Sequence, residues 1–132
     1  MTASDHTLAT VELFNEAFNR HDVEAVMKLM TDDIVFENTS GGRFDGQEAV
    51  RGVLTRAFEL MSTGWFETED TYANGDRCVV LWTYTSHTKE PERGNVRGVD
   101  VFRVRDGMVA EKLSYVKSED FVRRLGLQIP RT

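Results

Sequence analysis

The spacing of the apolar residues changes once along the chain, and this change restricts the fold more than any other feature. Up to about residue 61, apolar residues recur every three or four positions, which is typical of amphipathic helices. From Trp65 onward they recur at every second position, which is typical of strands with one buried face. The order predicts an α+β fold in which helices come first and a sheet follows. A chain of 132 residues is expected to form a single domain over residues 1–132.

Three helices are expected before the sheet. The first ends near Arg20, and Asp22 is a suitable N-cap for a second, shorter helix. The third begins after Asp45, which together with Glu48 has the spacing of a capping box. The apolar stripes of the three helices are Leu8, Val11, Phe14 and Phe18, then Val23, Val26, Met27 and Met30, then Val50, Val53, Leu54, Ala57, Phe58 and Met61.

The other elements are strands and turns. The segment DDIVFEN (32–38) has strand chemistry, and SGGRFDG (40–46) supplies turn residues and a short strand. After the third helix, the turn sequences ANGD, KEPERGN and RDG separate strands near 65–72, 77–88, 96–104 and 108–117. This pattern predicts an antiparallel meander that curves around the helices as a cone. Residues 118–132 are expected to form a C-terminal tail with a short helix.

Composition and charge argue against several classes of partner. The net charge is −6 and no basic patch offsets it, so nucleic acid and anionic membranes are not expected partners. No stretch approaches the roughly 18 apolar residues of a membrane span, and the N-terminus lacks a signal-peptide pattern. The single cysteine cannot form an internal disulfide, so we expect a cytoplasmic protein. The three histidines lie far apart, so no metal site is expected, and we expect no cofactor.

One carboxylate stands within an apolar strand. In RGVDVFRVRDG (97–107) the side chains alternate, so Asp100 shares a face with Phe102 and Val104. If that face looks inward, the acid lies in an apolar interior, where a charge is costly unless it is paired or its pKa shifts. Asp100 is therefore a candidate functional residue. The alternative is a buried structural acid whose hydrogen bonds are satisfied.

The strand at 77–88 presents aromatic side chains on one face. Val80, Trp82, Tyr84 and Ser86 share this face, which suits an apolar pocket with a few polar groups. The alternative is that the two aromatic residues only fill the core. The opposite face of the strand is also apolar, which indicates packing against a second subunit.

The order of elements and three motifs resemble a known superfamily. The motifs are FNRHDVEAVMKLMTDDIVFEN (18–38), FDGQEAVRGVL (44–54) and GVDVFRVRDGMVAE (98–111). They are similar to the nuclear transport factor 2-like superfamily, in its SnoaL-like and ketosteroid-isomerase-like branch. The resemblance implies a cone-shaped, mixed but mostly antiparallel sheet around three N-terminal helices, a cystatin-like α+β barrel with a deep apolar pocket. It also implies a homodimer packed through the outer sheet face, but not one function, because this fold hosts isomerases, cyclases, hydrolases, dehydratases and non-catalytic adaptors.

The resemblance also implies site residues. Ketosteroid isomerase uses an aspartate base and an oxyanion hole made of a tyrosine and a protonated aspartic acid. In this chain the second acid falls on Asp100, the base falls on Asn38 and the tyrosine falls on Phe14. An amide cannot shuttle a proton and a phenyl ring cannot donate a hydrogen bond, so that mechanism is not expected here. A site like that of limonene epoxide hydrolase is not expected either, because Arg103 falls on the face opposite Asp100.

Two criteria disagree about which side chains of the last strand point inward. The resemblance points Lys112, Ser114 and Val116 inward, whereas hydrophobicity alone selects Val109, Leu113 and Tyr115. If Lys112 points inward, it can pair with Asp100 on the neighbouring strand. The acid would then be part of an ion pair rather than a proton donor.

These observations define a candidate site and two functions. The expected catalytic residues are Asp100 and Asn38, and the expected ligand-binding residues are Phe14, Phe18, Phe36, Phe58, Trp82, Tyr84, Phe102 and Lys112. The expected partner is a small, largely apolar molecule. An enzyme of isomerase, cyclase or hydrolase type would use Asp100 to exchange a proton and Asn38 to orient a polar group. The alternative is a ligand-binding or dimerisation domain without chemistry.

Overall fold

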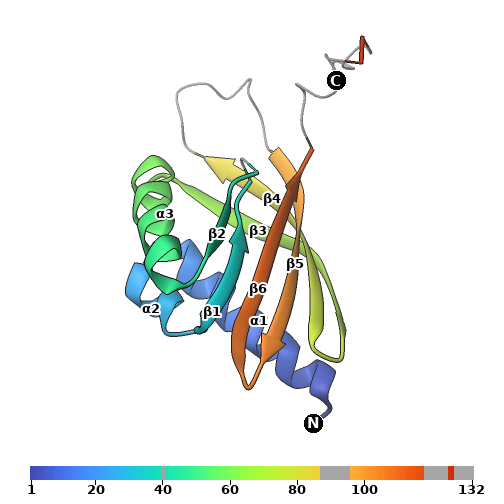
Figure 1. The fold of residues 1–132 in the computed structure, drawn as a ribbon. Coiled ribbons are helices and arrows are strands. Elements are labelled where there is room, and N and C mark those ends of the chain that lie inside the picture. The colour runs from blue at the N-terminus through green and yellow to red at the C-terminus, as the bar shows by residue number, and fades with distance from the viewer. Residues whose placement is uncertain (40, 87–95, 118–124, 127–132) are drawn as a thin grey trace.

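A computed structural model describes residues 1–39, 41–86, 96–117 and 125–126, and the fold is given for these residues (Figure 1). Its elements are α1 (Ala3–Asn19), α2 (Val23–Met27), β1 (Met30–Glu37), β2 (Arg43–Asp45), α3 (Gln47–Leu60), β3 (Gly64–Asn74), β4 (Arg77–Ser86), β5 (Val96–Arg105) and β6 (Met108–Val116). The predicted α+β fold, with three helices in the N-terminal half and a curved, mostly antiparallel sheet, is confirmed. The tail predicted at 118–132 lies outside the described residues, apart from a turn at 125–126.

The sheet positions the site by its strand order. The six strands are arranged β2-β1-β6-β5-β4-β3, and the only parallel neighbours in this order are β1 and β6. Helix α1 packs across β3 to β6, and α3 packs on β1 and β2, so the helices lie on one side of the curved sheet (Figure 1). The sheet and helices together form the predicted cone.

Side chains cap two of the three described helices at the N-terminus, and Thr2 is the cap of α1. Asp22 caps α2, where its carboxylate accepts a hydrogen bond from Ala25 N at 3.0 Å, as predicted. The capping box predicted for α3 is wrong, because the N-cap is Gly46, which has no side chain to accept a bond. Asp45 belongs to β2 instead and accepts a hydrogen bond from Arg43. Met30, predicted on the stripe of the second helix, begins β1 and is fully buried.

A bulge in β6 explains why the two criteria for this strand disagreed. Val104 pairs with Val109, and Arg103 pairs with Glu111, so Ala110 is an extra residue on β6. The bulge shifts the alternation by one position, and both Val109 and Lys112 therefore face the interior, with 0% and 6% exposure. Hydrophobicity was right before the bulge and the resemblance was right after it.

A second bulge explains why the segment WFETEDTY does not alternate cleanly. Thr68 pairs with Trp82 and Asp70 pairs with Leu81, so Glu69 is the extra residue on β3. Its carboxylate accepts hydrogen bonds from Thr83 on β4 and from Arg97 on β5. The bulged residue thus joins three neighbouring strands on the outer side of the sheet.

The core lies between the helices and the inner face of the sheet. Its largest fully buried side chains are Phe14, Phe102, Met30, Ile34, Leu54, Val11, Val26, Val50, Val109 and Cys78. They come from all the layers, so the helices and the sheet share one core. None of the helices in the described part of the chain is long and apolar enough to cross a membrane.

Candidate functional site

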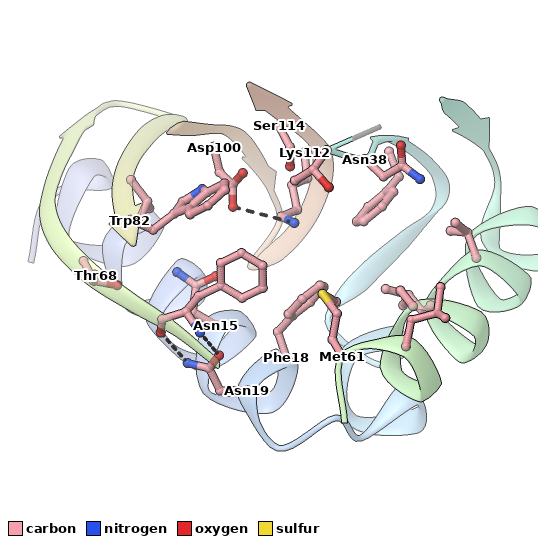
Figure 2. Close-up of a pocket in the computed structure, with 18 residues that line it drawn as sticks. Asn15, Phe18, Asn19, Asn38, Met61, Thr68, Trp82, Asp100, Lys112 and Ser114 are labelled. Carbon is pink, nitrogen blue, oxygen red and sulfur yellow. Dashed lines mark hydrogen bonds and ion pairs between the residues drawn. The ribbon is translucent and has the colours of Figure 1, made fainter. Parts of the chain in front are cut away.

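The inner face of the sheet and helices α1 and α3 enclose a cavity of about 300 Å³ (Figure 2). Its apolar wall consists of Phe18, Phe36, Val53, Leu54, Ala57, Leu60, Met61, Phe66, Val80 and Trp82. Its polar lining consists of Asn15, Asn19, Asn38, Thr39, Thr68, Asp100, Lys112 and Ser114. An enclosed, largely apolar space with a few polar side chains is the usual form of a site for a small molecule.

The residues that line the cavity differ in exposure. Thr39, Leu60 and Thr68 line the cavity and are also exposed to solvent, so the cavity reaches the surface beside them. Asp100, Lys112 and Trp82 line the same cavity but are buried, with exposures of 6%, 6% and 3%. The charged groups are therefore buried members of the lining.

Asp100 and Lys112 form a buried ion pair in the lining of the cavity. Lys112 Nζ lies 3.6 Å from Asp100 Oδ2 (Figure 2), and only about 8% of each side chain is exposed. The ammonium also lies over the rings of Phe18, at 4.5 Å, Phe36, at 4.8 Å, and Phe14, at 5.9 Å. Ring faces attract a cation, so the carboxylate and the rings together stabilise a charge inside an apolar cavity.

Two polar atoms beside this ion pair have no hydrogen-bond partner within the described part of the chain. They are Asp100 Oδ1, an acceptor, and Trp82 Nε1, a donor. A buried polar atom without a partner costs free energy, and native proteins contain few of them. Both atoms belong to side chains that line the cavity, so a bound molecule could supply the missing hydrogen bonds.

Asn19 holds α1 to the start of β3. Its Nδ2 donates to Phe66 O at 2.9 Å, and its Oδ1 accepts from Phe66 N at 2.8 Å (Figure 2). Asn15, one helical turn earlier, also lines the cavity. Sequence analysis missed both residues, although their spacing of four places them beside the apolar stripe of Phe14 and Phe18. That spacing is the signal that could have revealed them.

Asn38 lies where β1 turns into β2. Its side-chain Oδ1 accepts a hydrogen bond from Gly42 N at 3.0 Å, and its backbone N–H donates to Gly42 O at 3.0 Å. The residue lines the cavity, next to Thr39, where the cavity reaches the surface. Its amide oxygen is therefore engaged in shaping the turn.

The structure brings six of the ten predicted site residues together around the cavity: Asp100, Asn38, Phe18, Phe36, Trp82 and Lys112. Phe14, Phe58 and Phe102 are buried in the adjacent core. The ring of Phe14 packs against Phe18 and Phe102, and the ring of Phe58 packs against Phe18. Tyr84 packs on Phe66. The Tyr84 hydroxyl lies against the backbone of Gly64, so closely that a Cβ added at Gly64 would be only 1.9 Å from it. These four therefore back the wall of the cavity rather than line it.

Other titratable groups lie away from the cavity. Asp33 is exposed and its hydrogen bond from Arg105 lowers its pKa. Arg103 faces outward and pairs with Asp76 at 3.6 Å. Burial raises the pKa of the Cys78 thiol to about 11, which makes it a poor nucleophile. The described residues contain no cluster of three side chains suited to a metal ion, and His87 lies outside them.

Comparison with known proteins places the chain in a family. The sequence profile described as the SnoaL-like domain matches residues 11–112, which include most of the cavity's lining. The chain belongs to the SnoaL-like family. The sequence is not significantly similar to any curated protein.

Solved structures share the fold of this SnoaL-like chain. A nuclear transport factor 2-like protein of unknown function from Mesorhizobium loti is 31% identical, with a TM-score of 0.75 over 89% of this chain and 96% of that one. A candidate ketosteroid isomerase from Kribbella flavida is 16% identical, with a TM-score of 0.75 over 100% and 87% of the two chains. A limonene-epoxide-hydrolase-like epoxide hydrolase from M. tuberculosis is 22% identical, with a TM-score of 0.70 over 91% and 89%. The last two similarities establish the fold alone.

Proposed function

We propose that this SnoaL-like chain binds a small, largely apolar molecule in the cavity, with one polar group of that molecule placed against Asp100 and Lys112. The observation that carries the proposal is the buried Asp100 Oδ1, which has no hydrogen-bond partner among the described residues and belongs to a side chain that lines the cavity. The apolar wall would bind the rest of the molecule by excluding water.

The finer proposal is acid–base chemistry on the bound molecule. The Asp100 carboxylate would be the base that accepts a proton from the substrate. Lys112 would stabilise negative charge that develops on an oxygen of the substrate. Asn38 lines the cavity beside Thr39, where it would orient the substrate. The reaction would be of isomerase, cyclase or hydrolase type.

A second candidate is a binding domain without chemistry. The same ion pair favours this candidate, because a carboxylate that is paired with Lys112 can have a purely structural role. The engagement of the Asn38 amide oxygen by Gly42 supports it as well. The two candidates differ in turnover and not in where the molecule binds.

Filling the cavity tests the binding proposal. Ala57 lines the cavity on α3, and Ala49 is exposed on the same helix. We expect Ala57→Phe to abolish binding of β-tetralol, a bicyclic alcohol, measured by equilibrium dialysis, while Ala49→Phe leaves binding unchanged. Equal binding by both variants would place the molecule elsewhere and reject the proposal.

Hydrogen exchange separates the enzyme from the binder. In heavy water, a base that removes the proton next to the carbonyl of β-tetralone breaks that C–H bond and sends the electron pair to the oxygen. Return of a deuteron to the carbon then labels the ketone, which NMR detects. For the enzyme we expect exchange above the buffer rate that is lost in Asp100→Asn. Binding of the probe without added exchange would support the second candidate.

A further inference from the structure

Three polar groups lie in one diagonal row across three neighbouring strands. Asp100 is opposite Val80 on β4 and opposite Ser114 on β6. Trp82 and Lys112 are each two residues from those positions, so they are diagonal neighbours of Asp100 on the same face of the sheet. Figure 2 shows Asp100 between the other two.

The row offers two donors and one acceptor to a bound molecule. Among the described residues Trp82 Nε1–H has no partner. Lys112 Nζ lies 3.6 Å from Asp100 Oδ2, which is within ion-pair distance but longer than a normal hydrogen bond. Asp100 Oδ1 is an acceptor without a partner in the part of the chain that the structure describes. The carboxylate torsion is broad, so either of its oxygens can turn toward a molecule in the cavity.

A hydroxyl group is the complement of this row. It has one O–H to donate to Asp100 and two lone pairs to accept from Trp82 and Lys112. A ketone or carboxylate accepts only and leaves Asp100 Oδ1 without a partner, and a carboxylate also places a like charge beside it. An ammonium donates only and is repelled by Lys112.

Building on the proposed function, we infer that the polar group of the ligand is a neutral hydroxyl, that of an alcohol or phenol on an apolar skeleton, held by Asp100, Trp82 and Lys112 together. The ion pair carries no net charge, so a neutral ligand leaves no unbalanced charge in the cavity. The volume of about 300 Å³ is at the small end of ligand sites, which restricts the skeleton to a small one.

Three probes with one carbon skeleton test this inference on the unmodified protein. They are β-tetralol, β-tetralone and tetralin, which carry a hydroxyl, a carbonyl and no polar group, and their affinities are measured by equilibrium dialysis. We expect the alcohol to bind about ten- to a hundredfold more tightly than the hydrocarbon, and more tightly than the ketone, because its hydrogen bonds involve charged groups.

Variants identify the residues that read the hydroxyl. The ratio of the affinities for alcohol and hydrocarbon is compared within each variant, since this ratio cancels changes in packing. We expect Trp82→Phe to lower this ratio about threefold to tenfold. Asp100→Asn is expected to remove the preference for alcohol over ketone, because its amide can also donate to a carbonyl. Trp65→Phe removes an indole that does not line the cavity. This variant should leave the alcohol-to-hydrocarbon and the alcohol-to-ketone affinity ratios unchanged.

The outcomes separate this inference from the proposed function. If the alcohol and the hydrocarbon bind equally, or the ketone binds as tightly as the alcohol, the hydroxyl inference is overturned while binding in the cavity stands. If none of the three probes binds, the proposed function is overturned as well.

Discussion

Asp100 and Lys112 lie as two opposite charges inside an apolar cavity, and each depends on the other. The pair is 3.6 Å apart and almost entirely buried, and three phenylalanine rings surround the ammonium. Removing one partner of a buried pair leaves an uncompensated charge, whereas replacing both partners by neutral groups is often harmless. We therefore expect the loss of one partner to cost more stability than the loss of both.

Lys112→Met tests this dependence. We expect the single variant to lower the free energy of unfolding by about 3 to 5 kcal/mol, because the Asp100 carboxylate loses its cation. The double variant Asp100→Asn with Lys112→Met should recover most of that loss. Urea unfolding of the three proteins provides the measurement. A single variant as stable as the parent would show that the carboxylate does not need the ammonium.

The bulges in β3 and β6 decide which side chains reach the cavity. In β5, where no residue is inserted between Val96 and Arg103, alternation alone predicted that Asp100 faces inward. In β6 the extra residue Ala110 turns Lys112 inward, and the sequence carries no local signal for it. A bulge depends on how the neighbouring strand pairs, so reading one strand at a time cannot locate it.

The sequence also predicted the helices better than their ends. The apolar stripe of α1 and the Asp22 cap depend on residues within one helix, and both were correct. The start of α3 depends on Gly46, which has a φ of 86° and donates a backbone hydrogen bond to Ile34 O on β1. This contact lies outside the helix, so the helix sequence alone does not reveal it. The role of Asn19 could not be predicted for the same reason, because its hydrogen-bond partner Phe66 is 47 residues away in the sequence.

Asn19→Ala should weaken the connection between α1 and β3. The change leaves Phe66 N and Phe66 O without their side-chain partners, so we expect a loss of about 1 to 3 kcal/mol in the free energy of unfolding. Asn15→Ala, four residues earlier on the same helix, is the matched control and should cost much less. Thermal and urea unfolding measure both. Equal losses in the two variants would mean that the clamp does not stabilise the protein.

Glu69 makes the contact between β3, β4 and β5 dependent on pH. Its hydrogen bonds from Arg97 and Thr83 lower its pKa from 4.5 to about 2. A carboxyl group whose pKa is lowered by folding stabilises the folded state above its unfolded pKa, and this contribution is lost as pH falls toward 2. We expect the urea midpoint to fall between about pH 4.5 and 2, and to fall less in Glu69→Gln. The same slope in both proteins would contradict this assignment.

The outer face of the sheet, which the helices do not cover, carries an apolar patch on β4, β5 and β6 (Figure 1). Its half-buried or exposed side chains are Val79, Leu81, Val99, Val101, Leu113 and Tyr115. Their ladder partners lie side by side, from Val79 beside Val101 to Val99 beside Tyr115, so the patch is continuous over β4, β5 and β6. A continuous apolar patch of this kind usually marks an interface, and we propose that it is the surface of a homodimer.

Leu81→Arg tests the dimer. We expect the unmodified chain to sediment with the mass of two chains, and the variant with the mass of one, because a charge at the centre of the patch opposes its burial. Leu13→Arg, at an exposed position of α1, should remain a dimer. A parent protein that sediments as a single chain would contradict the proposal.

The cavity can be observed directly through the two tryptophans of the chain. Each indole N–H gives its own signal in a nitrogen–proton correlation spectrum, and Trp65→Phe assigns them. On titration with β-tetralol, the signal of Trp82 should shift to saturation while that of Trp65 stays in place, because only Trp82 lines the cavity. A Trp82 signal that does not move while the alcohol is bound would show that the ligand does not enter the space between α1, α3 and the sheet.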